Sequence, residues 1–222
     1  MLHVVIATNN RHKFLELTAL LRVRGIRWHS LAEFPSLPGV REDGKTFAAN
    51  AVKKARAVAR ATGWFALADD SGIEVQALGW GPGVQSARFA GRHGDDQANN
   101  AKLLRALNHL PIARRRARYR CVLALANPRR LLAAVTGTWD GRIAFAPEGS
   151  GGFGYDPLFL VPGFGQTVGR LPASVKRRLS HRARATRRMK PVLQRLARAS
   201  GRTGSGAGRA GRARAVSARP AG

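Results

Sequence analysis

The chain has 222 residues, of which 44% are hydrophobic, which is enough to bury the core of one domain and excludes a wholly disordered protein. No apolar run approaches the roughly 20 residues that span a bilayer, and the single cysteine, Cys121, excludes an intrachain disulfide and is expected in the core. The formal net charge is +27, and residues 157–222 carry 16 Lys and Arg without one Asp or Glu, a balance that predicts attraction to nucleoside triphosphates, nucleic acid or anionic membranes.

The N-terminal third of the chain is predicted to contain two strands and two helices. Residues 4–7 form an apolar run typical of a buried strand, and because no basic leader precedes them we expect a cytoplasmic protein without a signal peptide. Helical apolar spacing follows over residues 13–21, and a second helix is predicted over 46–62 with Gly63 as its C-cap. Residues 64–68 predict a second buried strand that ends at the acidic segment 69–72.

The rest of the chain continues this alternation. The predicted elements are a strand continuation at 73–75, a helix at 95–108, strands at 117–126, 131–138 and 142–146, a glycine-rich loop at 149–157 and a helix from about residue 174, kinked or restarted by Pro191. Helices mixed with strands in this way predict an α/β fold with a mixed sheet.

The last residues have a different composition. Residues 198–222 are almost entirely Arg, Gly, Ala, Ser and Pro, with Val216 as the one large aliphatic side chain. Such a segment buries too little apolar surface to offset its ordering entropy. We therefore predict a folded domain over 1–197 and a disordered basic tail over 198–222, with non-specific nucleic-acid contact through that tail.

Polar clusters follow the predicted strands, where α/β sheets bind their ligands. The segment after the first strand offers a hydroxyl, two amides, a helix N-terminus and basic side chains, and all of these groups can bind phosphate oxygens. Its residues are Thr8, Asn9, Asn10, Arg11, His12 and Lys13. The glycines of a Walker loop are missing, and the segment taken alone favours an ordinary capped turn over a phosphate site.

Acidic residues form two further clusters. Asp69 and Asp70 are adjacent carboxylates, which repel each other unless a cation or buried hydrogen bonds compensate, and magnesium is held by one or two carboxylates together with substrate phosphates. An acidic turn is an equal alternative for this pair. Glu42 and Asp43 form a second pair before a helix, which taken alone indicates a capping turn.

The glycine-rich loop and the following helix suggest a pocket for a flat ligand. Phe153, Tyr155 and Asp156 stand among glycines that allow close backbone approach, and an aromatic ring can stack on a base. Lys176, His181 and Arg182 make a cationic helix segment with no acidic neighbour. A strained turn and a solvated basic face are the alternatives.

Taken in order, these motifs resemble the inosine triphosphate pyrophosphatases, which hydrolyse non-canonical purine nucleotides. The matching segments cover about residues 3–197 and are Thr8-Asn9-Asn10 with Lys13, Thr46-Phe47 with Asn50-Ala51, Asp69-Asp70-Ser71-Gly72, Gly152 to Pro157, and Lys176 with His181-Arg182. The resemblance implies an elongated mixed sheet with flanking helices in two lobes, an active-site cleft, a homodimer, and hydrolysis of ITP, dITP and XTP to the monophosphate and pyrophosphate.

The same resemblance implies residue roles. Asp70 is the expected general base and a Mg²⁺ ligand, with Glu42 as a second acidic contact. The triphosphate is expected on residues 8–13, Ser71 and Lys176, and the base on Phe153, Gly154, Tyr155, Asp156, His181 and Arg182. A donor from Arg182 or His181 to the 6-oxo group of hypoxanthine or xanthine would disfavour adenine, which presents an amino group there.

The sequence departs from the family pattern in places, and other functions stay open. Ala49 stands where Glu is common, Gly169 where Ala is common and Ala183 where Gly is common, so we expect weaker magnesium binding if that Glu is a ligand. The alternatives are a pyrophosphatase for pyrimidine or modified nucleotides, an inactive homologue, and a nucleic-acid-binding protein driven by charge. The last alternative leaves Asp70 and Glu42 without a role.

Overall fold

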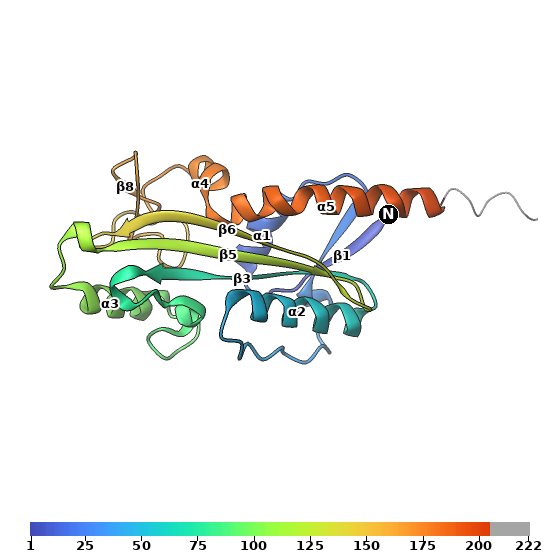
Figure 1. Ribbon diagram of the computed structural model, residues 1–222, viewed down its shortest axis with the longest axis horizontal. Helices are drawn as coiled ribbons and strands as arrows, with labels where there is room; N and C mark the ends of the chain where they lie inside the picture. Colours follow the sequence, from blue (N-terminus) through green and yellow to red (C-terminus); the bar gives the residue numbers. More distant parts are fainter. Residues whose placement is uncertain (205–222) are drawn as a thin grey trace, which may run out of the picture.

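This computed structural model describes residues 1–204 of the chain. These residues form a mixed sheet with helices on both faces (Figure 1). The strands lie in the order β2-β1-β3-β5-β6-β7-β8, and β4 pairs with β3. β1 is parallel to β2 and β3, whereas the other pairs are antiparallel. The predicted α/β fold with a mixed sheet is therefore confirmed.

The bounds of the elements are as follows. The strands are β1 (Leu2–Ile6), β2 (Ile26–Ser30), β3 (Phe65–Val75), β4 (Gly81–Pro82), β5 (Arg116–Ala126), β6 (Leu131–Ile143), β7 (Phe159–Val161) and β8 (Gln166–Thr167). The helices are α1 (Arg11–Leu20), α2 (Phe47–Thr62), α3 (Asp96–Leu107), α4 (Ala173–Leu179) and α5 (His181–Gly204).

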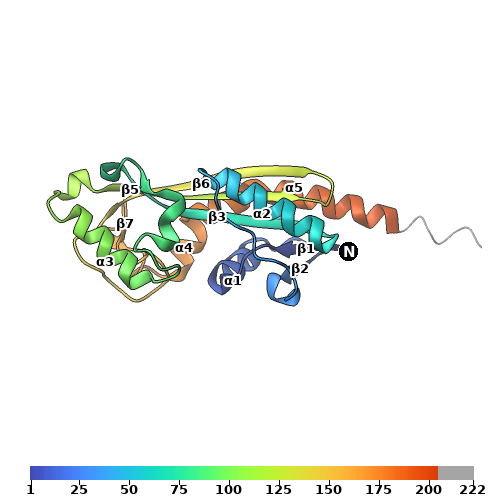
Figure 2. The ribbon, with the colours of Figure 1, turned by 90° about the horizontal axis from the view of Figure 1, so that it is seen from below.

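The long strands β3, β5 and β6 run through the whole molecule and join its two ends (Figures 1 and 2). At one end, β1, β2, α1, α2 and most of α5 surround them, and at the other end α3, α4, β7 and β8 do so. Each end has buried apolar side chains of its own, for example Leu123 and Leu193 at the first and Trp139 and Phe159 at the second. The two ends are the two lobes expected from the sequence.

Alternation along the strands determines which helix each side chain meets. Leu123 and Leu125 of β5 pack with α1 and α5, whereas Val122 and Ala124 pack with α2 on the opposite face. The α2 helix begins and ends as predicted, because the Thr46 side chain accepts from the Ala49 N–H and Gly63 closes the helix with a left-handed φ of 73°.

Two strand boundaries differ from the prediction. β3 continues through the acidic pair, so the predicted end at residues 69–72 is wrong, because antiparallel pairing with β5 holds from Ala66 to Val75. β6 is likewise one strand rather than two segments, because its pairing with β5 continues through Trp139. β2 is an additional strand that the apolar pattern does not predict, since Arg and His interrupt its apolar side chains.

The helical C-terminal region also differs. The extended backbone of Ser180 separates α4 from α5, and Pro191 lies inside α5, so the restart predicted at Pro191 is wrong. α5 extends to Gly204, past the predicted start of the tail at residue 198. Residues 205–222 of the predicted tail lie outside the described residues. Among the helices of residues 1–204, none is long and apolar enough to cross a membrane.

Candidate active site

The candidate site forms where β1 stops beside a longer neighbour. β1 pairs with β3 as far as Ile6 and Leu67 and then ends, while β3 continues to Val75. The chain after β1 therefore turns over the part of β3 that carries Asp69 and Asp70. The acidic pair lies within its strand, yet it stands at the carboxyl end of a parallel neighbour, which is where α/β sheets bind ligands.

Asp69 and Asp70 point to opposite faces of the sheet, as neighbours in a strand must. Asp69 faces the side of α1 and α5, where it contacts Lys13 and Arg182. Asp70 faces the side of α2, where Lys54 approaches it. The two carboxylates thus avoid direct repulsion and meet separate sets of partners.

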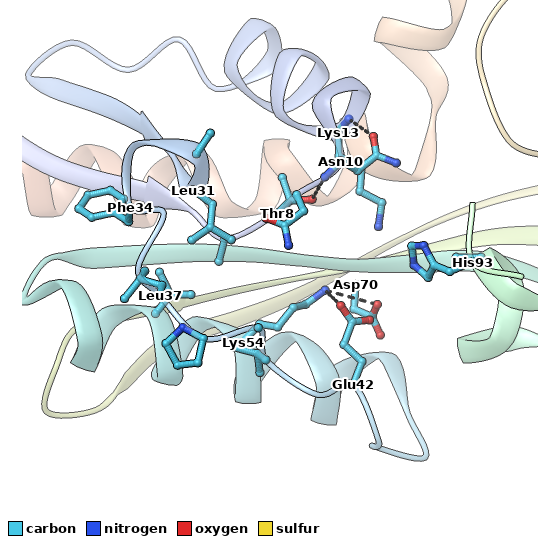
Figure 3. A pocket seen from close by; sticks show the side chains of 18 of the residues that line it. Thr8, Asn10, Lys13, Leu31, Phe34, Leu37, Glu42, Lys54, Asp70 and His93 are labelled. Carbon is cyan, nitrogen blue, oxygen red and sulfur yellow. Dashed lines mark hydrogen bonds and ion pairs between the residues drawn. The ribbon is translucent and has the colours of Figure 1, made fainter. Parts of the chain in front are cut away.

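On the α2 side, Asp70, Glu42 and Lys54 form one acid–base cluster (Figure 3). Lys54 Nζ lies 2.9 Å from Glu42 Oε1 and 3.7 Å from Asp70 Oδ1. Burial, with a contribution from Glu42, raises the pKa of Asp70 to about 6, although Lys54 opposes the shift. Burial also disfavours the charge of Glu42, but Lys54 outweighs it and the pKa of Glu42 falls below its usual value.

This pair of carboxylates fits a magnesium ion. Asp70 is 6% exposed, and its Oδ2 is buried without a hydrogen-bond partner, which is costly unless a ligand completes it. Residues 1–204 contain no group of three or more His, Cys, Asp and Glu side chains placed to hold a metal. A metal here would therefore rely on Asp70 and Glu42 together with water and substrate oxygens, which is the usual environment of Mg²⁺.

On the opposite face, Asp69 is a fully buried anchor for cations and a hydroxyl. Lys13 Nζ lies 2.7 Å from Oδ1, and Arg182 Nε donates to Oδ2 over 3.0 Å. The Ser71 hydroxyl and the Cys121 thiol also donate to this carboxylate. Burial alone would favour the neutral acid, but Arg182 and Lys13 outweigh it and hold the pKa of Asp69 well below its usual range.

The loop after β1 adds polar groups above these carboxylates. Asn10 caps α1 by accepting from the Lys13 N–H, and Thr8 accepts from the Asn10 N–H. A cavity of about 390 Å³ is lined by Thr8, Asn9, Asn10, Lys13, Glu42, Lys54, Asp70 and Ser71, with apolar residues at its far end. Arg11 and His12 are exposed and lie outside this lining.

A second hollow of about 120 Å³ adjoins the first and shares Asn10, Lys13 and Ser71 with it. Its lining gathers the predicted base-binding residues Phe153, Gly154, Tyr155, Asp156, His181 and Arg182, together with Lys176, which was expected to hold the triphosphate. His12 stacks on Phe153 with ring centroids 5.4 Å apart. Except for Arg11, the predicted site residues therefore meet in one cleft or pack directly against it.

Asp156 organises the floor of the second hollow. Its carboxylate accepts from Lys176 Nζ at 2.6 Å, from the Phe153 N–H at 2.9 Å and from the Tyr119 hydroxyl at 3.2 Å. Burial raises the pKa of Asp156, against the influence of Lys176. Lys176 also lies over the Phe153 ring, so it belongs to the end of the cleft expected for the base and not to the end near Asp70.

His181 and Arg182 differ in how many of their ring or guanidinium nitrogens have a hydrogen-bond partner. Each nitrogen of the buried Arg182 guanidinium donates to a protein oxygen, on Asp69, Glu16 and Ser71. His181 stacks on Tyr119, and its buried Nδ1 has no hydrogen-bond partner. Burial, reinforced by Arg182, lowers the pKa of His181 well below its usual value and keeps the ring neutral. A neutral imidazole presents one donor and one acceptor.

Lys54 lies in the candidate site although the sequence motifs did not predict it there. It is 9% exposed on the apolar face of α2, with Phe47, Ala51 and Val58 at helical spacing around it. A lysine among buried positions needs an anionic or carbonyl partner, and here Glu42 and the Asp69 carbonyl provide it. Its place within the apolar stripe was the available signal.

Comparisons of the sequence find relatives that match most of this chain. The chain is 50% identical over 193 residues to a protein of Desulforamulus reducens named dITP/XTP pyrophosphatase, covering 87% of this chain and 96% of that one. A Geobacillus kaustophilus protein of the same name is 47% identical over 203 residues, covering 91% and 100%.

Solved structures match as well. A HAM1 protein from Coxiella burnetii superposes with a TM-score of 0.80 at 41% identity, covering 88% of this chain and 100% of that chain. The Staphylococcus aureus Ham1 protein gives 0.79 at 36% identity, with 87% and 99% covered. The family model that matches residues 4–192 is that of the Ham1 family, so the resemblance seen in the sequence is confirmed and this chain belongs to the Ham1 family.

Proposed function

We propose that this protein is a Mg²⁺-dependent nucleoside-triphosphate pyrophosphatase that hydrolyses ITP, dITP and XTP and so keeps them out of DNA and RNA. The observation that carries the proposal is the buried, incompletely bonded carboxylate of Asp70 beside Glu42, in one cleft with Lys13 and an aromatic hollow. The names of relatives at 47–50% identity support the choice of substrate.

The triphosphate would lie in the larger part of the cleft. The Thr8 hydroxyl, the Asn10 amide and Lys13 offer donors to its oxygens, and Lys13 is held in place by Asp69. Bound Mg²⁺ would supply charge neutralisation for the phosphate oxygens at Asp70 and Glu42. Lys54, which now bridges these carboxylates, would remain available to the leaving group.

Asp70 is placed to act on water. With a pKa of about 6 the carboxylate is ionised at neutral pH and remains basic enough to accept a proton. Water oxygen adds to the α-phosphorus, its proton passes to Asp70, and the bond from that phosphorus to the α–β bridging oxygen breaks. The products are the nucleoside monophosphate and pyrophosphate.

The smaller hollow would hold the base against Phe153 and Tyr155. Three of the five N–H groups of buried Arg182 already donate to protein oxygens, whereas the buried Nδ1 of His181 has no partner among residues 1–204, so His181 is the better candidate to donate to the 6-oxo group. Adenine presents an amino group at that position and would leave the donor without an acceptor. Arg182 would then act by holding Asp69 and Ser71 in position.

The test is a substrate panel. Purified protein is given ITP, dITP, XTP, ATP and dTTP with MgCl₂, and pyrophosphate and monophosphate are measured, with parallel samples in excess EDTA. We expect release from the first three substrates and none in EDTA. Equal turnover of all five, or phosphate instead of pyrophosphate as product, would contradict the proposal.

We also propose that the protein acts as a homodimer in the cytoplasm. The support is the family resemblance for the dimer and the location of the nucleotide pool for the compartment. Sedimentation equilibrium at micromolar concentration measures the first, and cell fractionation the second. A monomer at all concentrations would overturn the dimer.

A further inference from the structure

The outward face of α5 carries a row of arginines that the proposed reaction does not use. Its exposed or half-buried members follow the helical repeat, while Met189 and Leu193 of the opposite face are buried against the sheet. We call this row the α5 basic face; it consists of Arg184, Arg187, Arg188, Arg195 and Arg198.

Within residues 1–204, no carboxylate forms an ion pair with this face. On α4 and α5, Lys176 and Arg182 form ion pairs with carboxylates, and both of them lie in the cleft. Arg184, Arg187 and Arg188 donate to backbone carbonyls, which orient the side chains and leave their charge in place. No Asp or Glu follows Asp156 in the sequence.

We propose that the α5 basic face binds the phosphate backbone of double-stranded nucleic acid without reading its sequence. From Arg184 to Arg198 the helix rises by about 21 Å, a length over which one strand of a duplex presents roughly six phosphates. Guanidinium groups bind phosphate well because their planar N–H groups match two of its oxygens.

The surface chemistry favours a duplex over the other polyanions. A helix that lies on a membrane needs an exposed apolar side, but the apolar side of α5 packs into the core through Ala185, Met189 and Leu193. Single strands are held by stacking on aromatic rings, and α5 contains no aromatic residue besides the buried His181. A row of cations held on a rigid helix matches the regularly spaced phosphates of a duplex.

This surface is separate from the cleft. Only the first turn of α5, with His181 and Arg182, lines the smaller hollow. Figure 1 shows the rest of the helix running along the sheet away from α3 and α4, with α2 and α3 on the other side of the sheet. The proposal therefore does not rest on the pyrophosphatase activity.

The experiment compares two triple variants of the full chain with equal net charge. One is Arg187→Gln, Arg195→Gln and Arg198→Gln on the α5 basic face. The control replaces the exposed Arg56, Arg60 and Arg105 of α2 and α3 by Gln. Binding to a fluorescent 24-base-pair duplex of random sequence is measured from 50 to 300 mM KCl, beside a single strand of equal length and vesicles with anionic lipid.

We expect the α5 variant to lower the slope of log K against log salt by about 2 to 3, since each lost phosphate contact contributes about 0.9. The control should change the slope by less than about 1. Circular dichroism and ITP turnover should match the parent in both variants. Equal losses in the two variants would mean that bulk charge alone binds the duplex, and an unchanged α5 variant would exclude this face. Tighter binding to the single strand, or a loss confined to vesicles, would overturn the choice of partner.

Discussion

Asp69 and Asp70 follow one another in the chain and differ in ionisation. Asp69 is surrounded by Lys13 and Arg182 and keeps its charge. Among residues 1–204, Lys54 is the one cation within 4 Å of the Asp70 carboxylate. Asp70 shares that lysine with Glu42 and has a raised pKa. One carboxylate therefore holds other groups in position, while the other has a raised pKa that suits its proposed role as the base.

Replacing Asp70 by Asn should abolish turnover and make the protein more stable. The rise of its pKa from 3.8 to about 6 corresponds to about 3 kcal/mol of unfavourable burial of the ionised form. Because the pKa of Asp70 is higher in the folded state than in the unfolded state, the free energy of unfolding falls by this amount as the pH rises from about 4 to 6. The variant should therefore gain up to about 3 kcal/mol at pH 7.5 and almost nothing at pH 3.5.

Urea unfolding at the two pH values measures the stability, and pyrophosphate release from ITP measures turnover. Glu42→Gln serves as a matched control, because the pKa of Glu42 is lowered and removing its charge should bring no gain. Near-normal turnover of Asp70→Asn would remove Asp70 from the role of base. Equal gains in both variants would contradict the assignment of the raised pKa.

Replacing Asp69 by Ala should destabilise the protein by about 3–5 kcal/mol, since it leaves buried Arg182 and the Lys13 ammonium without their shared partner. Ser71→Ala removes a donor to the same carboxylate and the acceptor of Arg182 Nη2 but leaves both ion pairs of Asp69 in place, so it should cost less, about 1–3 kcal/mol. Thermal unfolding of the two variants compares these effects. A cost for Asp69→Ala no larger than that for Ser71→Ala would show that Asp69 is not the anchor.

His181→Ala should reduce discrimination between ITP and ATP. A neutral hydrogen bond to the 6-oxo group contributes about 0.5–1.5 kcal/mol, or roughly 2- to 13-fold in kcat/KM for ITP. The already low rate with ATP should change little, so the ITP/ATP ratio narrows. Arg182→Ala should instead lower both rates in parallel, because Arg182 holds Asp69 and Ser71. A narrower ratio in the Arg182 variant alone would return the base contact to Arg182.

At the scale of the elements, the sequence predicts those parts whose signals are local. The caps at Thr46 and Gly63 identify α2 because the cap is made within the helix itself. β3 is harder, since Asp69-Asp70-Ser71-Gly72 has low strand propensity and only pairing with β5 keeps it extended. The break at Ser180 does have a local cause that the sequence analysis did not use, because the extended Ser180 caps α5 by accepting from the Ala183 N–H.

The residues of the candidate site also fall into those that local sequence patterns predict and those that they do not. Motif spacing identified Lys13, Asp70 and the loop around Phe153, and these residues do meet. The opposite directions of Asp69 and Asp70 depend on β3 being one continuous strand, so the predicted turn concealed them. The partners of Arg182 come from α1 and β3, segments far away in the sequence, and no local pattern reveals them.

At the scale of the whole molecule, the apolar side chains of α5 that pack into or beside the core are found as far along the helix as Ala197. Leu193 is buried, and Leu196 and Ala197 pack beside it at the edge of the core. Deleting residues 205–222 should therefore leave ITP turnover and thermal stability within error of the parent. Deleting 198–222 also removes the end of α5 with Arg198 and should weaken duplex binding further. A large loss of turnover in the shorter deletion would assign residues 205–222 to the folded enzyme.

The alternation of Asp69 and Asp70 limits how this gene can change in length. Inserting or deleting one codon between Leu67 and Asp69 would invert every following side chain of β3 relative to β5. The anchoring acid would then face Lys54, and the reactive acid would face Arg182 and lose its basicity. Turns away from the cleft, such as residues 127–130 between β5 and β6, can vary in length without this effect. Length changes compatible with activity are therefore expected in the loops, and β3 is expected to keep its number of residues.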